Sequence, residues 1–438
     1  MTEKVSSPIN LTPRWSNYAS YLPAISNAFA KGVNQKGRGG LPAPYTIADL
    51  NFLNPRSKLW FYGEALYSAG NFSNAKIAHD AVIDRNKKCT TILGDSGGFQ
   101  IGMGTLAGVE ALKKAKSAAD VCDKWLQAYK VRDWIVQWLE LNADYAMTID
   151  VPLWCIGKND SPFGKCTEAQ LIQLTVENLK FIKSEKRGQC KWLNVLQGTD
   201  TTSVIAWWNA VKRYRFDGWA LGGIMGSRGK LSDLLYQVML MREEGAFEAG
   251  QDWVHVLGVS TPRWAVVLTT MQQQLRATSN PKVRFTYDSA SAYIAGGKTQ
   301  KIVRYPQYTA EEKSWAFKNV RMPLSFSYAS EHGRRAFPFA SPVGDAFGLD
   351  VFNVNTDAFD RNRFDSLAYF MLQNHNVYVY LRALQEANDI ASLETDDRKG
   401  LMPQSLVKAI TGIESVFAAK NWRAKLQEQQ AELDAGIV

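Results

Sequence analysis

The sequence predicts an α/β fold, specifically a (β/α)8 (TIM) barrel with a basic N-terminal arm and a helical C-terminal extension. Two observations lead to this prediction. From about residue 41, short apolar runs alternate with longer amphipathic ones, which is the pattern of parallel strands joined by right-handed helical crossovers. In addition, single polar residues follow several different strand-like runs, and barrels of this kind carry their functional residues at such strand ends.

The predicted strands are the short apolar runs, at residues 90–94, 143–149, 191–197, 217–222, 252–257 and 283–287. The predicted helices are the amphipathic stretches, at residues 118–140, 166–184, 202–213, 230–246 and 262–277. The last helix has Thr261 as its cap and Pro262 at its first position, a common helix start.

A doubly wound sheet is the alternative arrangement. It would carry a phosphate-binding loop after an early strand. The glycine-rich run at residues 223–230 fits neither the dinucleotide fingerprint nor the P-loop. The barrel is therefore favoured.

The pattern divides the chain into three parts. Residues 1–40 are polar and irregular and end in a basic, glycine-rich run, which predicts a flexible basic arm. Residues 41–350 carry the alternation and form the predicted barrel domain. In residues 351–438 the alternation stops, and Leu406, Ile410, Ile413 and Phe417 recur at helical spacing, so this region is predicted to be helical.

Composition and charge limit the partners and the cellular compartment that are expected for this protein. The 438 residues are 46% hydrophobic, which is enough for a large core, and 51 Lys and Arg against 42 Asp and Glu give a net charge of +9. A basic balance suits a polyanionic partner. No apolar run approaches the length of a membrane span, so no membrane contact is expected. Five cysteines without a Cys-x-x-Cys pair predict reduced thiols in a cytoplasmic protein.

The polar residues at the strand ends carry the functional argument. They are Asp95, Asp150, Gln197, the pair Gly222-Gly223, and Asp288. Taken singly, an Asp after a strand is most often a helix cap or turn former. Five successive units share the feature, however, and a barrel would bring all five to one mouth. Three carboxylates, an amide and exposed backbone there would suit a flat, polar, purine-like base.

The six residues that follow the first predicted strand, Asp95-Ser96-Gly97-Gly98-Phe99-Gln100, resemble the signature of the tRNA-guanine transglycosylase superfamily. The resemblance extends over about residues 90–295 and keeps the order of the motifs. Its further segments are residues 144–150, 196–198, 221–223 and 257–262, with Asp288 where the family places its nucleophile.

These enzymes exchange guanine in a nucleic acid for a 7-deazaguanine on a TIM barrel. The resemblance implies that Asp288 attacks the anomeric carbon and forms a covalent glycosyl-enzyme, that Asp95 moves protons on the leaving and entering bases, and that Asp150 accepts hydrogen bonds from the N1 and amino edge of guanine. The further implied base contacts are Gln197, Gly222 and Gly223 toward O6, Phe99 and Leu257 on the faces of the ring, and Ser96, Gln100 and Gly258.

Physical chemistry is consistent with this division of roles. Cleavage of a glycosidic bond passes through an oxocarbenium-like state that a carboxylate stabilises or traps. The base leaves more easily when it is protonated, which a second carboxylic acid can do. A buried carboxylate is the natural acceptor for the donors at N1 and N2 of guanine, and such a site rejects adenine because its polar groups would be left unpaired.

Two departures from the family pattern refine the expectation. The tRNA enzymes carry a structural zinc site built from cysteines downstream of the nucleophile, whereas no cysteine follows Cys190 here, so neither zinc nor another cofactor is expected. The amino-acid sequence around Asp288 also differs from the usual sequence of the family at this position. The absence of the zinc module resembles the deazapurine DNA modification transglycosylases of phages and bacteria, which implies DNA and a free base such as 7-cyano-7-deazaguanine as substrates.

Basic residues near the predicted mouth are candidates for contacts with the nucleic-acid backbone. Arg228 and Lys230 follow a strand end near the predicted pocket, and Arg334 and Arg335 lie further along the chain. Further candidates are Lys31, Lys36, Arg38, Lys298, Lys301 and Arg304. A duplex substrate would require the target nucleotide to be flipped out. Trp154, just past Asp150, is a candidate for lining the pocket or stacking on a flanking base.

Several alternatives stay open at this point. The protein could be a zinc-free tRNA-guanine transglycosylase, a catalytically inactive paralogue that binds nucleic acid, or a glycosylase in which water completes the reaction. The sequence also leaves open whether the chain forms a homodimer.

Overall fold

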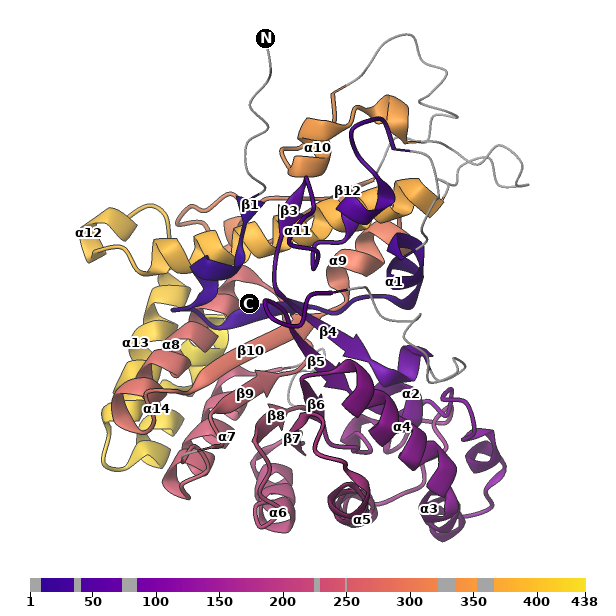
Figure 1. Cartoon of the computed structure of the whole chain (residues 1–438). Helices are drawn as coiled ribbons and strands as arrows, with labels where there is room; N and C mark the ends of the chain where they lie inside the picture. The colour runs from indigo at the N-terminus through magenta and orange to yellow at the C-terminus, as the bar shows by residue number, and fades with distance from the viewer. Residues whose placement is uncertain are drawn as a thin grey trace.

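The structure is a computed structural model that describes residues 9–34, 41–72, 85–223, 229–248, 250–321, 336–352 and 366–438. Its centre is a sheet of eight parallel strands that follow one another in chain order (Figure 1). These strands are β2 (Ser20–Pro23), β4 (Glu64–Ser68), β5 (Thr91–Asp95), β6 (Tyr145–Met147), β7 (Lys191–Leu196), β8 (Gly218–Leu221), β9 (Trp253–Val256) and β10 (Arg284–Ser289).

The sheet curls until its first and last strands meet. Strand β10 pairs in parallel with β2, and a parallel bridge between Ala24 and Leu66 joins the end of β2 to β4. The predicted (β/α)8 barrel is therefore confirmed. Its interior is filled by side chains, as expected for eight strands; the buried residues of this cluster are Leu22, Leu66, Leu93, Met147, Leu193, Val195, Ala220 and Trp253.

Helices cover the outside of the barrel between successive strands. They are α3 (Ala118–Gln127), α4 (Tyr129–Asn142), α5 (Glu168–Glu185), α6 (Thr201–Val211), α7 (Leu231–Glu243) and α8 (Pro262–Thr278). All predicted helices are present, although the stretch predicted at 118–140 is two helices that meet at Ala128. The Thr261 hydroxyl accepts a hydrogen bond from the Trp264 amide, so the predicted cap of α8 is confirmed.

The barrel begins earlier in the chain than predicted. Strand β2 and helix α1 (Asn27–Val33) lie within the segment predicted as a flexible arm, so that prediction is wrong for residues 20–33. All four residues of β2 are buried. Neither β2 nor β4 was predicted as a strand from the sequence, and most residues of both are buried by pairing within the barrel.

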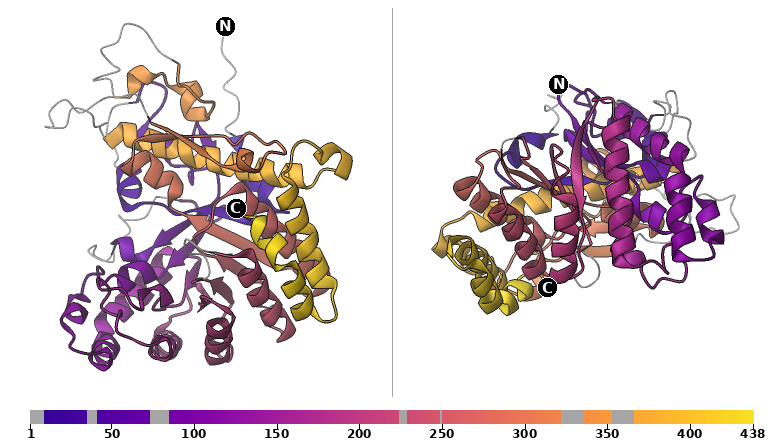
Figure 2. Two further views of the ribbon diagram at one scale, coloured as in Figure 1. Left: turned by 180° about the vertical axis from the view of Figure 1, so that it is seen from behind. Right: turned by 90° about the horizontal axis from the view of Figure 1, so that it is seen from below.

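The C-terminal region is helical, as predicted, but part of it belongs to the barrel wall. Helix α11 (Ser366–Ala391) packs against α8 and α1 and so occupies the place of the eighth outer helix (Figure 1). Helices α13 (Gln404–Ala418) and α14 (Trp422–Ala435) pack on each other and against α8 and α7 on the outside of the barrel (Figure 2).

Smaller elements complete the described parts of the chain. The strands β1 (Ile9–Asn10) and β3 (Trp60–Phe61) form a parallel pair, and β11 (Lys301–Arg304) pairs with β12 (Lys318–Arg321) in antiparallel fashion. Short helices are α2 (Gly98–Gly102), α9 (Ser291–Tyr293), α10 (Pro342–Ala346) and α12 (Thr395–Arg398), with a π-helical turn, η7, at Ile294–Lys298. The 3-10 turns are η1 (Thr12–Trp15), η2 (Ile47–Leu50), η3 (Ala69–Phe72), η5 (Glu110–Lys114), η6 (Leu153–Cys155), η8 (Glu312–Trp315) and η10 (Leu349–Val351). Within the described ranges, no helix has both the length and the apolarity that a membrane crossing requires.

Three consecutive buried side chains anchor α11 to the segments around it. Asn374 accepts from the Trp60 indole at 2.8 Å and donates to the Leu50 carbonyl at 2.7 Å. His375 contacts the Ser341 hydroxyl at 2.7 Å. Asn376 accepts from the Val303 amide at 2.8 Å and donates to the Lys301 carbonyl at 3.0 Å. Because these groups are buried, each hydrogen bond is needed to offset the loss of water.

We predict that Asn376→Leu destabilises the fold strongly. The substitution leaves the buried Val303 amide and Lys301 carbonyl unpaired, and each such group costs about 1–3 kcal/mol. The measurement is chemical denaturation, with Glu414→Leu at an exposed position of α13 as the control for adding an apolar side chain. Equal stability of the two variants would contradict the anchoring role.

Candidate functional site

The parallel barrel brings the predicted strand-end residues to one mouth. Asp95 is the last residue of β5, and Asp288 lies one residue before the end of β10. Asp150, Gln197 and Gly222 follow β6, β7 and β8. Since all eight strands run in the same direction, these residues surround the same end of the barrel.

Asp95 lies close enough to both other carboxylates to interact with them electrostatically. Burial raises the pKa of Asp95, and the Asp288 carboxylate raises it further, while the nearby Ser68 hydroxyl and Gly97 amide oppose the rise. Asp95 in turn raises the pKa of Asp150. A carboxyl group whose pKa is raised toward neutrality is suited to giving and taking a proton.

Asp150 and Gln197 form a buried pair. Asp150 follows β6, the neighbour of the strand that carries Asp95, and Gln197 follows β7. The Gln197 Nε2 amide donates to Asp150 Oδ2. Burial, and secondly the Asp95 charge, raises the pKa of Asp150 from 3.8 to about 7. The residues are only 5% and 4% exposed. Gln197 Oε1 has no hydrogen-bond partner among the described residues, so this amide retains capacity for a ligand.

The two glycines after β8 allow this amide to lie against the backbone. A Cβ atom on Gly223 would stand 2.8 Å from Gln197 Oε1, and Gly223 has a φ of +82°. A Cβ atom on Gly222 would stand 3.1 Å from Leu257 Cδ1. Only glycine fits at 223 on both grounds. The Gln197 amide and the glycine backbone after β8 therefore lie against each other.

Asp288 is held by groups on the adjacent strand β9 and the turn after it. The Gly258 amide donates to Asp288 Oδ1 at 3.0 Å, and His255 Nε2 lies 3.2 Å from the same oxygen. Gly258, predicted as a base contact, therefore binds the predicted nucleophile. His255 was not predicted, because a single His in an apolar strand is typical of a core residue. Its register opposite Thr286, two residues before Asp288, is the signal that could have identified it.

Phe99 and Leu257, the predicted apolar contacts, differ in exposure, and Ser96 is turned into the protein. Phe99 is 62% exposed at the mouth, and its ring centroid lies 5.5 Å from that of Trp154. Leu257 is half-buried against the barrel interior. Ser96 is fully buried and donates to the Thr148 carbonyl at 3.3 Å, so its hydroxyl joins β5 to the segment after β6 rather than facing the mouth.

Gln100 is directed toward the segment after β4. Its Nε2 donates to Asn71 Oδ1 at 3.0 Å, and its Oε1 lies where a Cβ atom on Gly70 would be only 2.4 Å away. This side chain therefore contacts η3 in the structure, and the predicted contact with a base would require it to leave Asn71.

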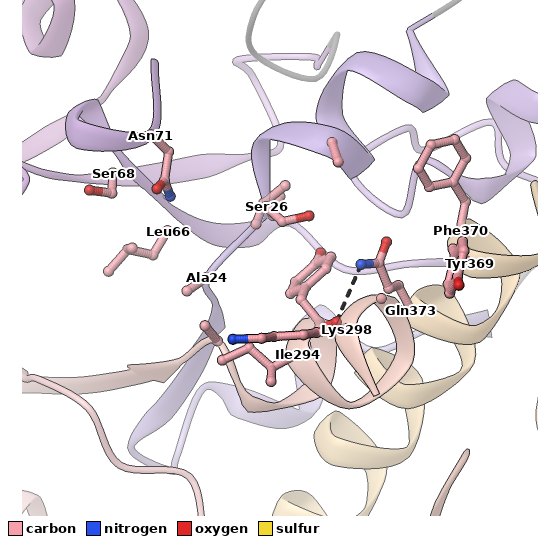
Figure 3. A pocket seen from close by; sticks show the side chains of 15 residues that line it. Ala24, Ser26, Leu66, Ser68, Asn71, Ile294, Lys298, Tyr369, Phe370 and Gln373 are labelled. Carbon is pink, nitrogen blue, oxygen red and sulfur yellow. Dashed lines mark hydrogen bonds between the residues drawn. The ribbon is translucent and has the colours of Figure 1, made fainter. Parts of the chain in front are cut away.

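A cavity of about 420 Å³ lies at the ends of β2, β4 and β10 (Figure 3), and Asp95, Asp150 and Asp288 are not among the residues that line it. Ser68 on its wall pairs in register with Asp95, and Ala290 follows Asp288 by two residues. Figure 3 shows Lys298 extending along the cavity toward Ala24. The rest of the wall is mostly apolar and includes Leu66, Ile294, Tyr293 and Phe370.

The predicted backbone-binding cations are only partly described. Lys230 is exposed immediately before α7. Arg228, Arg334 and Arg335 lie outside the described residues. Lys298 brings a cation directly to the cavity wall. Among the described residues, no cluster of three or more His, Cys, Asp and Glu side chains is arranged to hold a metal ion.

Comparison with known proteins adds little to this geometry. No family model matches the sequence, and no curated protein matches it. Among solved structures, the chain is similar to xylanase B from Clostridium stercorarium F9, with 10% sequence identity, coverage of 64% of this chain and 88% of that chain, and a TM-score of 0.33. A likeness at this score carries no argument, so the function is argued from the site itself.

We predict that the stability of Asp150→Asn relative to the wild type increases as the pH rises from about 4 to about 8. The folded-state pKa of about 7 lies above the ordinary value of 3.8, so the wild type loses stability as pH rises from about 4 through about 7, where the buried carboxyl must ionise. At about 1.4 kcal/mol for each pH unit of separation, the expected difference is a few kcal/mol.

The measurement is thermal or chemical unfolding of both proteins at several pH values between 4 and 8. Asp160→Asn, at an exposed position, is the matched control and should show no such trend. A stability difference between Asp150→Asn and wild type that is independent of pH would show that Asp150 is not held in this environment.

Proposed function

We propose that the protein is a guanine transglycosylase that exchanges guanine in DNA for a 7-deazaguanine through a covalent glycosyl-aspartate. One observation carries the proposal: Asp288, Asp95 and Asp150 occupy one barrel mouth, and their environments differ. Asp288 is anchored through a single oxygen, whereas Asp95 and Asp150 have raised pKa values. A raised pKa at Asp95 suits a group that gives and takes a proton, and the anchoring of Asp288 through one oxygen suits a nucleophile.

The first half of the reaction cleaves the glycosidic bond. Asp288 attacks the C1′ carbon of the target sugar and forms an ester bond as the bond from C1′ to the purine N9 breaks. The bonding electron pair leaves with the purine, and the Asp95 carboxyl supplies the proton that neutralises it. Burial of Asp95 favours its protonated form, which is the form needed for this step.

The second half reverses these roles with a different base. The Asp95 carboxylate takes the N9 proton of the incoming 7-deazaguanine, whose N9 then attacks C1′ and displaces Asp288. Two displacements at C1′ retain its configuration. No oxidant, reductant or metal is consumed, and the atoms balance as the exchange of one base for another.

Base recognition falls to Asp150, Gln197 and the glycines. The Asp150 carboxylate can accept from the N1 and amino hydrogens of guanine. Gln197 Nε2 carries a second hydrogen besides the one donated to Asp150, and with the Gly223 amide it can face O6. Adenine would leave this carboxylate and amide unpaired. Phe99 and Leu257 are placed at the mouth as apolar surfaces for the faces of the ring.

The assignment of DNA as the acceptor rests on charge and on the sequence resemblance. The net charge of +9 and the position of Lys298 on the cavity wall suit a sugar-phosphate backbone. The mostly apolar remainder of the cavity suits a sugar or a neighbouring base. Direct comparison of DNA and tRNA as substrates decides between the two acceptors.

We predict that the purified protein, incubated with DNA and 7-cyano-7-deazaguanine, produces the modified deoxynucleoside and releases guanine. Asp288→Asn should lower this rate by on the order of a thousandfold or more, because removal of a nucleophile removes the covalent route. The measurement is mass spectrometry of nucleosides from DNA and from tRNA. Asp160→Asn is the control, since it removes an exposed carboxylate.

Each alternative gives a different result in this experiment. Modified base in tRNA alone would overturn the assignment of DNA. Abasic sites that accumulate even with deazaguanine present would indicate a glycosylase. Absence of a denaturant-resistant adduct between the wild-type protein and either nucleic acid would indicate a binding protein.

A further inference from the structure

Two donors converge on one oxygen of Asp288 and leave the other unbound. The Gly258 amide and His255 Nε2 lie 3.0 Å and 3.2 Å from Oδ1. Within the described part of the chain, Oδ2 receives no hydrogen bond. A carboxylate that is held by one oxygen presents the other in a fixed direction, which is the arrangement that attack on a carbon requires.

The opposite edge of the His255 ring is bonded as well. His255 Nδ1 lies 2.9 Å from Thr286 Oγ1, and the Trp253 indole donates to the same hydroxyl oxygen at 2.7 Å. His255 and Thr286 face each other in the register of β9 and β10. His255 and Thr286 are fully buried, and Trp253 is 4% exposed, so water does not readily replace these contacts.

This chain of contacts selects one tautomer of the histidine. An indole N–H only donates, so Thr286 Oγ1 accepts from Trp253 and its own hydrogen remains for His255 Nδ1. A carboxylate only accepts, so His255 Nε2 must carry a hydrogen to bond Asp288. Both requirements are met when Nε2 carries a hydrogen and Nδ1 accepts one.

We propose that His255 is a positioning residue that holds Asp288 through Oδ1 and so directs Oδ2 at the sugar carbon, with Thr286 and Trp253 fixing its tautomer. This inference rests on the proposed function, because it takes Asp288 as the nucleophile. It assigns a role in the reaction to a histidine that would otherwise count as part of the barrel interior.

Few other ionisable groups face this pair. Asp95 on β5 interacts electrostatically with both His255 and Asp288, and Tyr21 on β2 interacts with Asp288. Gly258 contributes only its backbone. His255 is therefore the one ionisable side chain within the described residues that hydrogen-bonds Asp288, and its replacement can be interpreted directly.

Two substitutions separate a positioning role from a purely structural one. In His255→Gln the amide nitrogen can reach the place of Nε2 and still donate to Asp288. In His255→Asn the shorter amide reaches only the place of Nδ1, so it keeps the contact with Thr286 and loses Asp288. Both variants replace a buried imidazole with an amide, and a purely structural role would be impaired similarly in both.

The test measures the rate at which the covalent adduct between the protein and DNA forms in a single turnover. Thermal unfolding is the control for folding. We expect His255→Gln to stay within a few-fold of wild type. His255→Asn should be slower by about ten- to a hundredfold, the effect of losing a hydrogen bond to a charged group, with the KM for DNA unchanged. Equal rates in the two variants, or losses that follow their melting temperatures, would overturn the proposal.

A second measurement does not depend on the reaction. The chain contains four histidines, so selective ¹⁵N labelling can resolve the ring nitrogens of His255. We expect the hydrogen to be on Nε2 with Nδ1 as an acceptor, and a shift toward mixed tautomers in Thr286→Val. A hydrogen on Nδ1 in the wild type would overturn the inference. If the wild type forms no adduct with DNA or tRNA, the proposed function fails, and the labelled spectrum still decides the state of His255.

Discussion

Closure of the parallel barrel is the constraint on which the site depends. Parallel strands end on the same side, and the joining of β2 to both β10 and β4 converts that side into a ring. Residues separated by almost two hundred positions, such as Asp95 and Asp288, thereby come into electrostatic contact. An open sheet with the same strands would leave β2 and β4 as distant edges and would place Ser68 away from Ala290, so the cavity between them would not form.

Three carboxylates around one mouth repel one another, and the protein manages this repulsion in two ways. Asp288 Oδ1 accepts hydrogen bonds from His255 and Gly258. Burial raises the pKa of Asp95 and of Asp150, which favours their uncharged forms. The same side chain thus meets donors at one position and mainly burial at the other two. This separation requires that donors be supplied selectively, which explains why Gly258 faces Asp288 instead of a ligand.

Much of the fold could be predicted from the sequence because barrel strands buried on both sides are short apolar runs. Strands β5 to β10 also alternate with the long helices α3 to α8. Strands β2 and β4 are followed only by the short helix α1 and the turn η3, so this alternation did not mark them. In the site, Asp95, Asp150, Gln197 and Gly223 could be located by their position after a strand. The direction of a side chain could not, and for this reason Ser96 and Gln100 were assigned to a base although they contact protein. His255 was missed because a single His in an apolar strand is typical of a core residue.

The run from Gln373 to Asn376 links the cavity to the stability of the barrel. Asn374, His375 and Asn376 bond separate segments of backbone around α11, including residues that follow β10. Gln373, the preceding residue, lines the cavity and donates to the Tyr293 carbonyl at 3.3 Å (Figure 3). Successive helical residues point in directions about 100° apart, so one turn of α11 both fastens the segment after Asp288 and forms the cavity wall. The position of that wall relative to Asp288 is thus set by buried hydrogen bonds, which tolerate little displacement. A surface loop in this place would have allowed the wall to move, and the carboxylate would then face a cavity of variable shape.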